Sequence, residues 1–284
     1  MRADGKRVRD LPAIQAAIPY IMPRRYDAQN YITQYADMEP LRRYIQKKRK
    51  DGLRLSYMTL ILAAYFKTAQ QHPRINRFIM NSKVYQRNHF CVSFVILKKR
   101  ADGTPDETTL KIFFEEGDDV LSIHRKIEAA VEKNRVATHN NNTDKFANFM
   151  LSLPVLPKLV VGFAKLLDRY GLLPRFIIDL SPFHTSLFIT NLASINTRAI
   201  YHHCYEFGTT GVFVALGKPE GDPTGGGRKV LPLKVVMDER ICTGHDYAAF
   251  FFDMQRYLKR PELLENGAEE QEPAAEAESS AEAV

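Results

Sequence analysis

Three side chains that could take part in chemistry are neighbours in the sequence: the imidazoles of His202 and His203 and the thiol of Cys204. A thiol beside an imidazole base is a pairing used in nucleophilic catalysis. Adjacent residues seldom reach that geometry, however, and two adjacent histidines on a strand point to opposite faces of it. We therefore expect no more than one imidazole to enter a channel, and the three groups are too crowded to bind a metal ion together.

The cysteines of the chain indicate a reducing environment. Cys91, Cys204 and Cys242 are odd in number and far apart, which matches neither a disulfide framework nor a metal site. Buried thiols in a cytoplasmic protein without a metal ion are the prediction. A glycine-rich stretch at 220–228, EGDPTGGGR, lacks the Gly-Lys-Ser/Thr ending of a phosphate-binding loop. It is predicted to connect two strands.

Helices and strands alternate along the chain, which is typical of an α/β domain. Apolar spacing and capping residues predict helices at 39–50, 56–70, 118–135 and 246–259. Apolar, β-prone runs predict strands at 89–98, 109–114, 185–192, 211–217 and 230–237. Ser56 is expected to cap the second helix, which should be buried because apolar residues surround it almost completely.

The segment 231–264 resembles the C-terminal end of the catalytic domain of the 2-oxoacid dehydrogenase acyltransferases, also called dihydrolipoyl acyltransferases. In that family a strand leads into an Asp-His-Arg-x-x-Asp-Gly motif, then into a helix and a Pro-Glu-x-Leu-like ending. Here residues 238–244 read DERICTG and residues 261–264 read PELL. The motif is therefore present with its His and its second Asp replaced.

Other segments match the family in the right order, over roughly residues 12 to 264. They are YITQYADME at 31–39, the buried helix at 53–69, HPRIN at 72–76, SLFITNL at 186–192 and GVFVALG at 211–217. The resemblance implies the chloramphenicol acetyltransferase-like fold, an α/β two-layer sandwich of mixed sheet and helices, assembled as a homotrimer. Residues 1–11 would be a basic extension and residues 265–284 a disordered acidic tail.

The same resemblance implies acyl transfer between coenzyme A and a thiol or hydroxyl, at sites between the subunits. The family's motif His is the general base, a strand hydroxyl stabilises the oxyanion, and the motif Asp pairs with an Arg. Here Glu239 takes the His position, Thr243 the Asp position and Thr190 the hydroxyl position, while Gly244 is kept. These four residues are the candidate catalytic residues.

The replacement of His by Glu239 leaves two hypotheses open. A Glu carboxyl is a weaker base than imidazole by roughly two pKa units (~4.3 against ~6.5) unless burial raises its pKa. The protein is then either an acyltransferase with a degenerate motif or an inactive trimeric scaffold or binding protein. With Thr243 in place of Asp, the family's Asp–Arg pair cannot form, so Arg24 and Arg25 need a different partner.

Two further histidines lie close in sequence to the candidate residues. His245 directly follows Gly244 and is expected on the surface, at the start of the last helix. His184 precedes the strand that carries Thr190 and is expected in a loop or an interface. Neither imidazole is predicted to replace the missing base.

The charge distribution favours anionic partners. The net charge is +7, but eight of the 33 acidic residues lie from Glu262 onward, so 25 acidic and 40 basic residues give the rest +15. The negatively charged phosphates of acyl-CoA would be attracted to a domain with this positive charge. Nucleic acid ranks lower because no helix-turn-helix, zinc finger or RNP-type block is present, and the basic run at 47–50 reads as a solvated helix face. A lipoyl domain or dehydrogenase complex is a further possible partner.

The apolar content predicts a folded body without a membrane span. Of the 284 residues 45% are apolar, yet no apolar stretch reaches the ~20 residues needed to cross a bilayer. Residues 154–176 carry apolar residues at helical spacing between prolines. A core or subunit-interface helix is the favoured interpretation, and a lid over a hydrophobic substrate or a membrane-surface contact are the alternatives.

Overall fold

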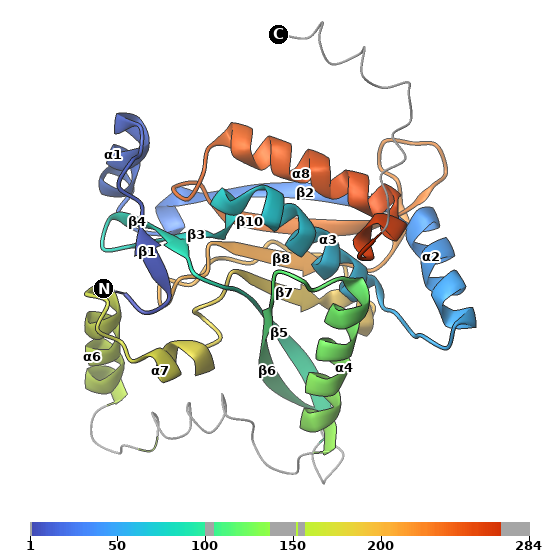
Figure 1. The fold of residues 1–284 in the computed structure, drawn as a ribbon, viewed down its shortest axis with the longest axis horizontal. Coiled ribbons are helices and arrows are strands. Elements are labelled where there is room, and N and C mark those ends of the chain that lie inside the picture. Colours follow the sequence, from blue (N-terminus) through green and yellow to red (C-terminus); the bar gives the residue numbers. More distant parts are fainter. Residues whose placement is uncertain (1, 100–104, 137–151, 153–156, 268–284) are drawn as a thin grey trace, which may run out of the picture.

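The computed structural model describes residues 2–99, 105–136, 152 and 157–267 of the chain. A twisted central sheet lies beside helices α3 and α8, and a small second sheet lies at one end of the molecule (Figure 1). Most of the predicted acidic tail, residues 268–284, and the first residues of the apolar stretch, 154–156, lie outside the described residues.

The main sheet has seven strands in the order β2-β10-β8-β7-β5-β6, with β9 beside β10. The strands are β2 (Gln29–Asp37), β5 (Phe90–Lys99), β6 (Pro105–Phe114), β7 (Leu187–Asn191), β8 (Val212–Leu216), β9 (Glu220–Gly221) and β10 (Lys229–Asp238). Strand β7 runs parallel to both β5 and β8, whereas the remaining pairs are antiparallel. The sheet is therefore mixed, as predicted.

Four helices enclose the larger apolar core together with one face of this sheet. They are α2 (Met38–Lys50), α3 (Tyr57–Gln71), α4 (Val120–Val136) and α8 (Gly244–Lys259). Helix α3 is buried on most of its circumference, and the Ser56 hydroxyl accepts the Thr59 backbone N–H at 3.1 Å. The core therefore includes the helix that the sequence predicts to be buried.

A second, three-stranded sheet has the order β1-β4-β3. Its strands are β1 (Gly5–Arg7), β3 (Arg77–Met80) and β4 (Lys83–Arg87), so part of the expected extension 1–11 pairs as a strand. The remaining helices of the described residues are α1 (Ala13–Ile21), α6 (Pro157–Arg169) and α7 (Arg175–Leu180), with short 3-10 turns at Tyr26–Ala28, Pro73–Asn76, Leu192–Ile195 and Pro261–Leu264.

The predicted helices and strands are confirmed, with ends that shift by four residues or fewer. The glycine-rich stretch at 220–228 lies between β8 and β10 as a connection that includes β9. The core interpretation of the apolar stretch is wrong for the single chain, because α6 keeps Leu159 and Phe163 more than half exposed, at 62% and 61%.

Candidate active site

Asp238, the last residue of β10, is the buried acid of the motif. Arg240 donates from Nε to its Oδ1 at 2.8 Å and from Nη2 to its Oδ2 at 2.7 Å. Arg25 approaches Oδ2 from another direction, with its Nε at 3.4 Å. A fully buried carboxylate requires such pairing because an isolated charge is costly to remove from water. Arg25 thus has a different partner from the one the family uses, namely Asp238.

Glu239 follows directly and is only partly buried. Its backbone N–H donates to the Ala28 carbonyl at 2.9 Å, and its Oε2 accepts the Asn30 amide at 2.7 Å. The residue lines a small hollow of about 40 Å³, together with Ile18, Arg77 and Thr243 among others. The carboxylate is therefore held beside the start of β2.

Thr243 and Gly244 start helix α8. The Thr243 hydroxyl accepts the Asp246 backbone N–H at 3.2 Å, and the Asp246 carboxylate accepts the Thr243 N–H at 2.9 Å. This reciprocal pair is a capping box, and Gly244 is the first helical residue. Because Asp and Thr are both favourable N-caps, the replacement at this position keeps a helix start.

Replacing Thr243 by Ala should lower the free energy of unfolding by about 1 kcal/mol, because the helix loses its cap. Thr243→Ser should stay close to the wild type, since its hydroxyl can still accept the Asp246 N–H and donate to the Asp246 carboxylate, as the Thr243 hydroxyl does at 2.9 Å. Urea unfolding followed by circular dichroism measures the difference. An Ala variant with an unchanged midpoint would show that the box does not stabilise the fold.

Thr190 lies on the sheet face turned away from the main core. Along β7 the side chains alternate, with Leu187 and Ile189 in the larger core and Phe188 in a smaller cluster on the opposite face. Thr190 shares the parity of Phe188 and lines a cavity of about 650 Å³. The walls are mostly apolar and include Phe213. The predicted oxyanion donor therefore does lie on a cavity.

The structure does not bring Thr190 and Glu239 together within one chain. Thr190 borders the large cavity, whereas Glu239 borders the small hollow near the start of β2. The two residues belong to β7 and to the end of β10, which β8 separates in the sheet. A catalytic pairing of these two groups therefore requires a second copy of the chain.

One of the adjacent histidines does enter the cavity. His202 lines it beside Thr190, and its ring stacks on Phe213 with centroids 4.3 Å apart. Burial lowers the pKa of His202, with a smaller contribution from His203, which favours the neutral ring. His203 is exposed and contacts Tyr205 edge-on. The expectation that only one imidazole can enter a channel agrees with this placement.

The cysteine next to these histidines is poorly suited to act as a nucleophile. Cys204 is buried, and this burial raises the pKa of its thiol to about 12. Its sulfur contacts the Val236 carbonyl at 3.9 Å rather than an imidazole. The thiolate required for nucleophilic attack is therefore disfavoured.

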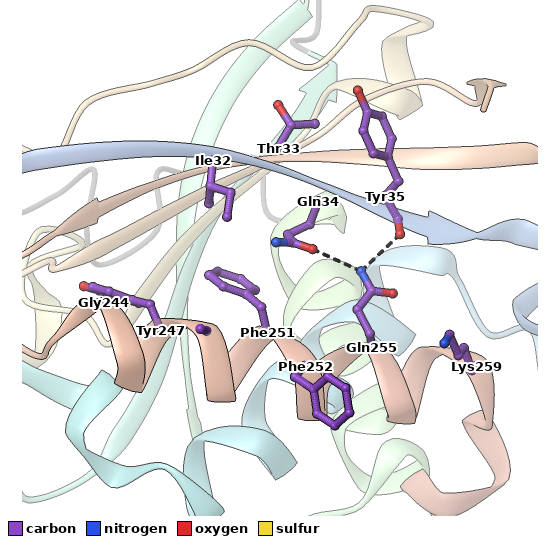
Figure 2. A pocket seen from close by; sticks show the side chains of 11 residues that line it. Ile32, Thr33, Gln34, Tyr35, Gly244, Tyr247, Phe251, Phe252, Gln255 and Lys259 are labelled. Atoms are coloured by element: carbon purple, nitrogen blue, oxygen red, sulfur yellow. Dashed lines mark hydrogen bonds between the residues drawn. The ribbon is translucent and has the colours of Figure 1, made fainter. Parts of the chain in front are cut away.

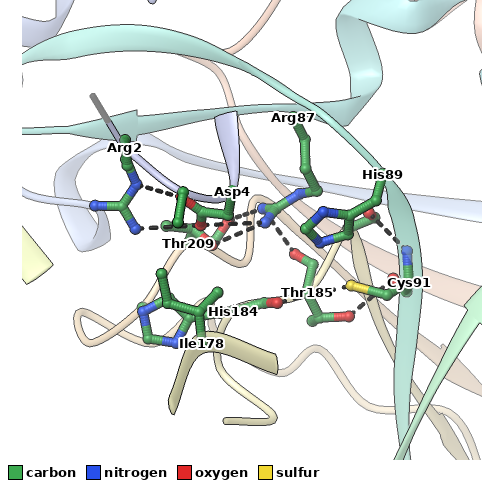
Figure 3. Close-up of polar contacts among 12 residues, drawn as sticks. Arg2, Asp4, Arg87, His89, Cys91, Ile178, His184, Thr185 and Thr209 are labelled. Atoms are coloured by element: carbon green, nitrogen blue, oxygen red, sulfur yellow. Dashed lines mark hydrogen bonds and ion pairs between the residues drawn. The ribbon is translucent and has the colours of Figure 1, made fainter. Parts of the chain in front are cut away.

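A buried ionic network that the sequence did not reveal joins distant parts of the chain (Figure 3). Arg2 contacts Asp4 and Asp168, both at 2.7 Å, and His184 lies 3.1 Å from Asp168. Arg87 lies 3.8 Å from Asp4. Burial lowers the pKa of His184 despite the neighbouring carboxylate. His184 is thus a structural residue of the interior, and no spacing in the sequence connects these groups.

Cys91 lies at the edge of this network and has unusual electrostatics. Burial alone would raise the pKa of its thiol, but Lys111, with His89 and Arg87, lowers it to about 6. Lys111 also donates to the Ile178, Ser181 and His184 carbonyls, at 2.8, 3.1 and 2.7 Å. Because Cys91 is fully buried, we assign it no role in catalysis.

A separate groove of about 710 Å³ lies between edge strand β2 and helix α8 (Figure 2). Gln255 reaches across it and donates to the Gln34 side chain at 3.3 Å and to the Tyr35 carbonyl at 3.1 Å. The groove borders Gly244 but neither Thr190 nor Glu239. It therefore does not unite the candidate residues.

The described part of the chain contains neither a metal-binding cluster nor a membrane-spanning helix. No group of three or more His, Cys, Asp or Glu side chains there could hold a metal ion. None of the helices in those same ranges is long and apolar enough to cross a bilayer.

The architecture is the chloramphenicol acetyltransferase-like fold, shared with catalytic domains of 2-oxoacid dehydrogenase acyltransferases. A probable dihydrolipoamide acetyltransferase from Listeria monocytogenes aligns with a TM-score of 0.55 and 13% identity, over 93% of this chain and 98% of that one. A chloramphenicol acetyltransferase aligns with a TM-score of 0.54 and 14% identity, over 90% and 100%. The predicted fold class is confirmed.

A third solved structure has the same fold. The truncated catalytic core of a 2-oxoacid dehydrogenase complex from Thermoplasma acidophilum has a TM-score of 0.55 and 11% identity, covering 90% of this chain and 99% of that one. No protein-family model matches the chain, and no curated protein sequence does either. At identities this low, the likeness concerns the fold.

Proposed function

We propose that the protein is a CoA-dependent acyltransferase that moves an acyl group between coenzyme A and a thiol or hydroxyl acceptor. One observation carries this proposal: Thr190 lines the mostly apolar cavity of about 650 Å³, together with Phe188 and Phe213. Small-molecule sites typically measure about 300–1,000 Å³ and combine apolar walls with a few polar groups. Apolar walls suit an acyl chain, and the hydroxyl suits a developing oxyanion.

In the proposed reaction, Glu239 takes the proton from the acceptor thiol or hydroxyl, which attacks the thioester carbonyl. The Thr190 hydroxyl donates a hydrogen bond to the oxyanion of the tetrahedral intermediate. The carbon–sulfur bond then breaks, and the coenzyme A sulfur takes the proton back from Glu239. Because Glu239 and Thr190 border different hollows in one chain, the carboxylate is contributed by a neighbouring copy in a homotrimer.

The proposed partners follow from charge and from the resemblance. The body before Glu262 carries a net charge of +15, which attracts the phosphates of coenzyme A. The dithiol of a lipoyl domain is the acceptor that the resemblance to the dehydrogenase acyltransferases suggests. A free small molecule is the acceptor that the resemblance to chloramphenicol acetyltransferase suggests.

The surroundings of Glu239 favour a second candidate function, an acyl-CoA-binding scaffold without transfer. Asn30 already occupies one oxygen of this carboxylate at 2.7 Å. The adjoining hollow of about 40 Å³ is far smaller than a thioester. A carboxylate is also a base weaker than imidazole by roughly two pKa units.

Calorimetric titration with coenzyme A and acetyl-CoA, followed by transfer assays with dihydrolipoamide and chloramphenicol, tests the proposal. We expect about one site per chain and transfer that falls about 100-fold or more in Thr190→Val, since one oxyanion donor is lost. Coenzyme A binding should change little in that variant. Glu239→Gln should also abolish transfer without weakening binding, whereas Glu239→His should raise it.

Three results would contradict parts of this assignment. No binding at millimolar coenzyme A by folded protein would remove the acyltransferase proposal altogether. Binding without transfer, in the wild type and in Glu239→His with Thr243→Asp, would establish the scaffold. Full transfer in Glu239→Gln, together with loss in His202→Gln, would move the base to the imidazole that shares the Thr190 cavity.

A further inference from the structure

Helix α6 presents an apolar stripe to solvent. Leu159, Phe163, Leu166 and Tyr170 follow one another at intervals of four, three and four residues, which places them on one helix face. Their exposed fractions are 62%, 61%, 51% and 62%. We call these four residues the α6 stripe. Side chains of this kind are normally covered, so the stripe indicates a contact surface.

Two apolar residues after the helix are also exposed to solvent. Leu172 and Phe176 are 67% and 63% exposed. They lie in the turn after α6 and at the start of α7, close to the chain's N-terminal segment, since Arg175 donates to the Ala3 carbonyl at 3.1 Å. Exposed apolar side chains thus continue along the sequence beyond the end of α6.

A row of basic side chains borders the stripe. Lys158, Lys165 and Arg169 are separated by seven and four residues and are all exposed. At 3.6 residues per turn they share one flank, about 100° around the helix from the stripe. The acidic residues between 157 and 180 are Asp168, which is buried against Arg2, and Asp179, which pairs with Arg175. The flank of the stripe therefore carries a net positive charge.

The side of α6 opposite the stripe is fixed to the body. Asp168 points inward and binds Arg2 at 2.7 Å and His184 at 3.1 Å. In Figure 1 the helix lies at the periphery of the molecule, beside α7 and remote from α3 and α8. The contacts of Asp168 with Arg2 and His184 therefore fix the orientation of α6, with the α6 stripe facing outward.

We propose that the α6 stripe docks on an anionic lipid bilayer. Leu, Phe and Tyr side chains on one face, with Lys and Arg beside them, form the pattern of helices that lie in the membrane interface. The stripe enters the boundary between headgroups and acyl chains, and Lys158, Lys165 and Arg169 contact the lipid phosphates. The body charge of +15 strengthens attraction to an anionic surface. A second copy of the chain is a less suitable occupant of the α6 stripe, because it would bring a second positively charged domain to this face.

Co-sedimentation of the full chain with vesicles tests the proposal. One vesicle type is pure phosphatidylcholine, and the other contains equal parts of phosphatidylcholine and phosphatidylglycerol. We expect about tenfold stronger binding to the anionic vesicles, declining as salt screens the basic row. Phe163→Ser with Leu166→Ser, and separately Lys158→Glu with Lys165→Glu, should each reduce binding about tenfold or more.

Matched variants on other helices provide the controls. Lys47→Glu with Lys50→Glu makes the same charge change on exposed positions of α2, and Phe252→Ser removes an aromatic ring that is 76% exposed on α8. Both should keep most of the vesicle binding. Circular dichroism verifies folding of each variant, and light scattering gives its mass in solution.

Three outcomes would overturn the proposal. Equal binding to both vesicle types would remove the role of lipid charge. Equal loss in the α2 variant would assign binding to overall charge rather than to the α6 stripe. Absent vesicle binding, with a smaller mass in solution for Phe163→Ser with Leu166→Ser, would identify the stripe as a contact between subunits.

Discussion

Replacing Asp238 by Asn is expected to lower the free energy of unfolding by about 3–5 kcal/mol. The amide preserves the shape of the side chain, but it removes the negative charge that faces two guanidinium groups. Arg25 and Arg240 are only 4% and 6% exposed, so neither can recover its hydration without a local rearrangement. Urea unfolding at neutral pH measures the loss.

Glu239→Gln is the matched control for this variant. It removes the same charge one residue further along, from a carboxylate that is partly exposed and bound by the neutral Asn30 amide. Its expected loss is about 1 kcal/mol or less. Losses of similar size in both variants would show that the two arginines do not depend on Asp238. If Asp238→Asn does not accumulate, Arg240→Lys keeps the charge, loses the two-point contact and should be destabilised to a smaller degree.

Gly208→Ala is expected to be the second severe substitution, with a loss of about 3 kcal/mol or more. Gly208 has φ +86°, and an added Cβ would lie 2.6 Å from the Phe183 carbonyl carbon. This carbonyl cannot move freely, because it accepts the backbone N–H groups of Thr209 and Thr210 at 2.8 and 3.1 Å. The carbonyl of Gly208 itself accepts a hydrogen bond from the Arg25 guanidinium at 3.2 Å. Thermal unfolding measures the loss of stability.

Gly52→Ala separates backbone strain from crowding. Gly52 has nearly the same φ, +82°, but no heavy atom lies within 4 Å of its added Cβ. Only the cost of the left-handed conformation remains there, about 1–2 kcal/mol. If both variants lose the same stability, the contact with Phe183 has no energetic consequence and the interpretation of Gly208 is wrong.

The sequence was sufficient for the main sheet and its helices because their periodic patterns are long. Helix α3 has a cap and an almost continuous apolar surface, and β7 and β8 are strongly apolar runs. The small sheet was missed because β3 and β4 have four and five residues, too few for a clear alternation. Helix α1 was missed because it has only nine residues and Pro19 lies inside it.

The candidate site was predictable residue by residue but not as an arrangement. The alternation along 186–192 turns Thr190 to the face of Phe188, whereas α8 starts at Gly244, two residues before the predicted start at 246. The separation of Thr190 from Glu239 depends on β8 lying between β7 and β10, and strand order is not encoded in local spacing. The partner of Arg25 depends on the same long-range arrangement.

The contact between Arg2 and Asp168 can form only late during synthesis of the chain. The two residues are 166 positions apart. A ribosome that adds roughly 5–20 residues per second needs on the order of ten seconds to cover that interval. Strand β1 can pair with β4 early in this period, but the charges of Arg2 and Asp4 cannot be buried together with Asp168 until α6 has emerged. Arg2 and Asp4 are thus made well before they can reach their final environment, a late closure that favours slow folding.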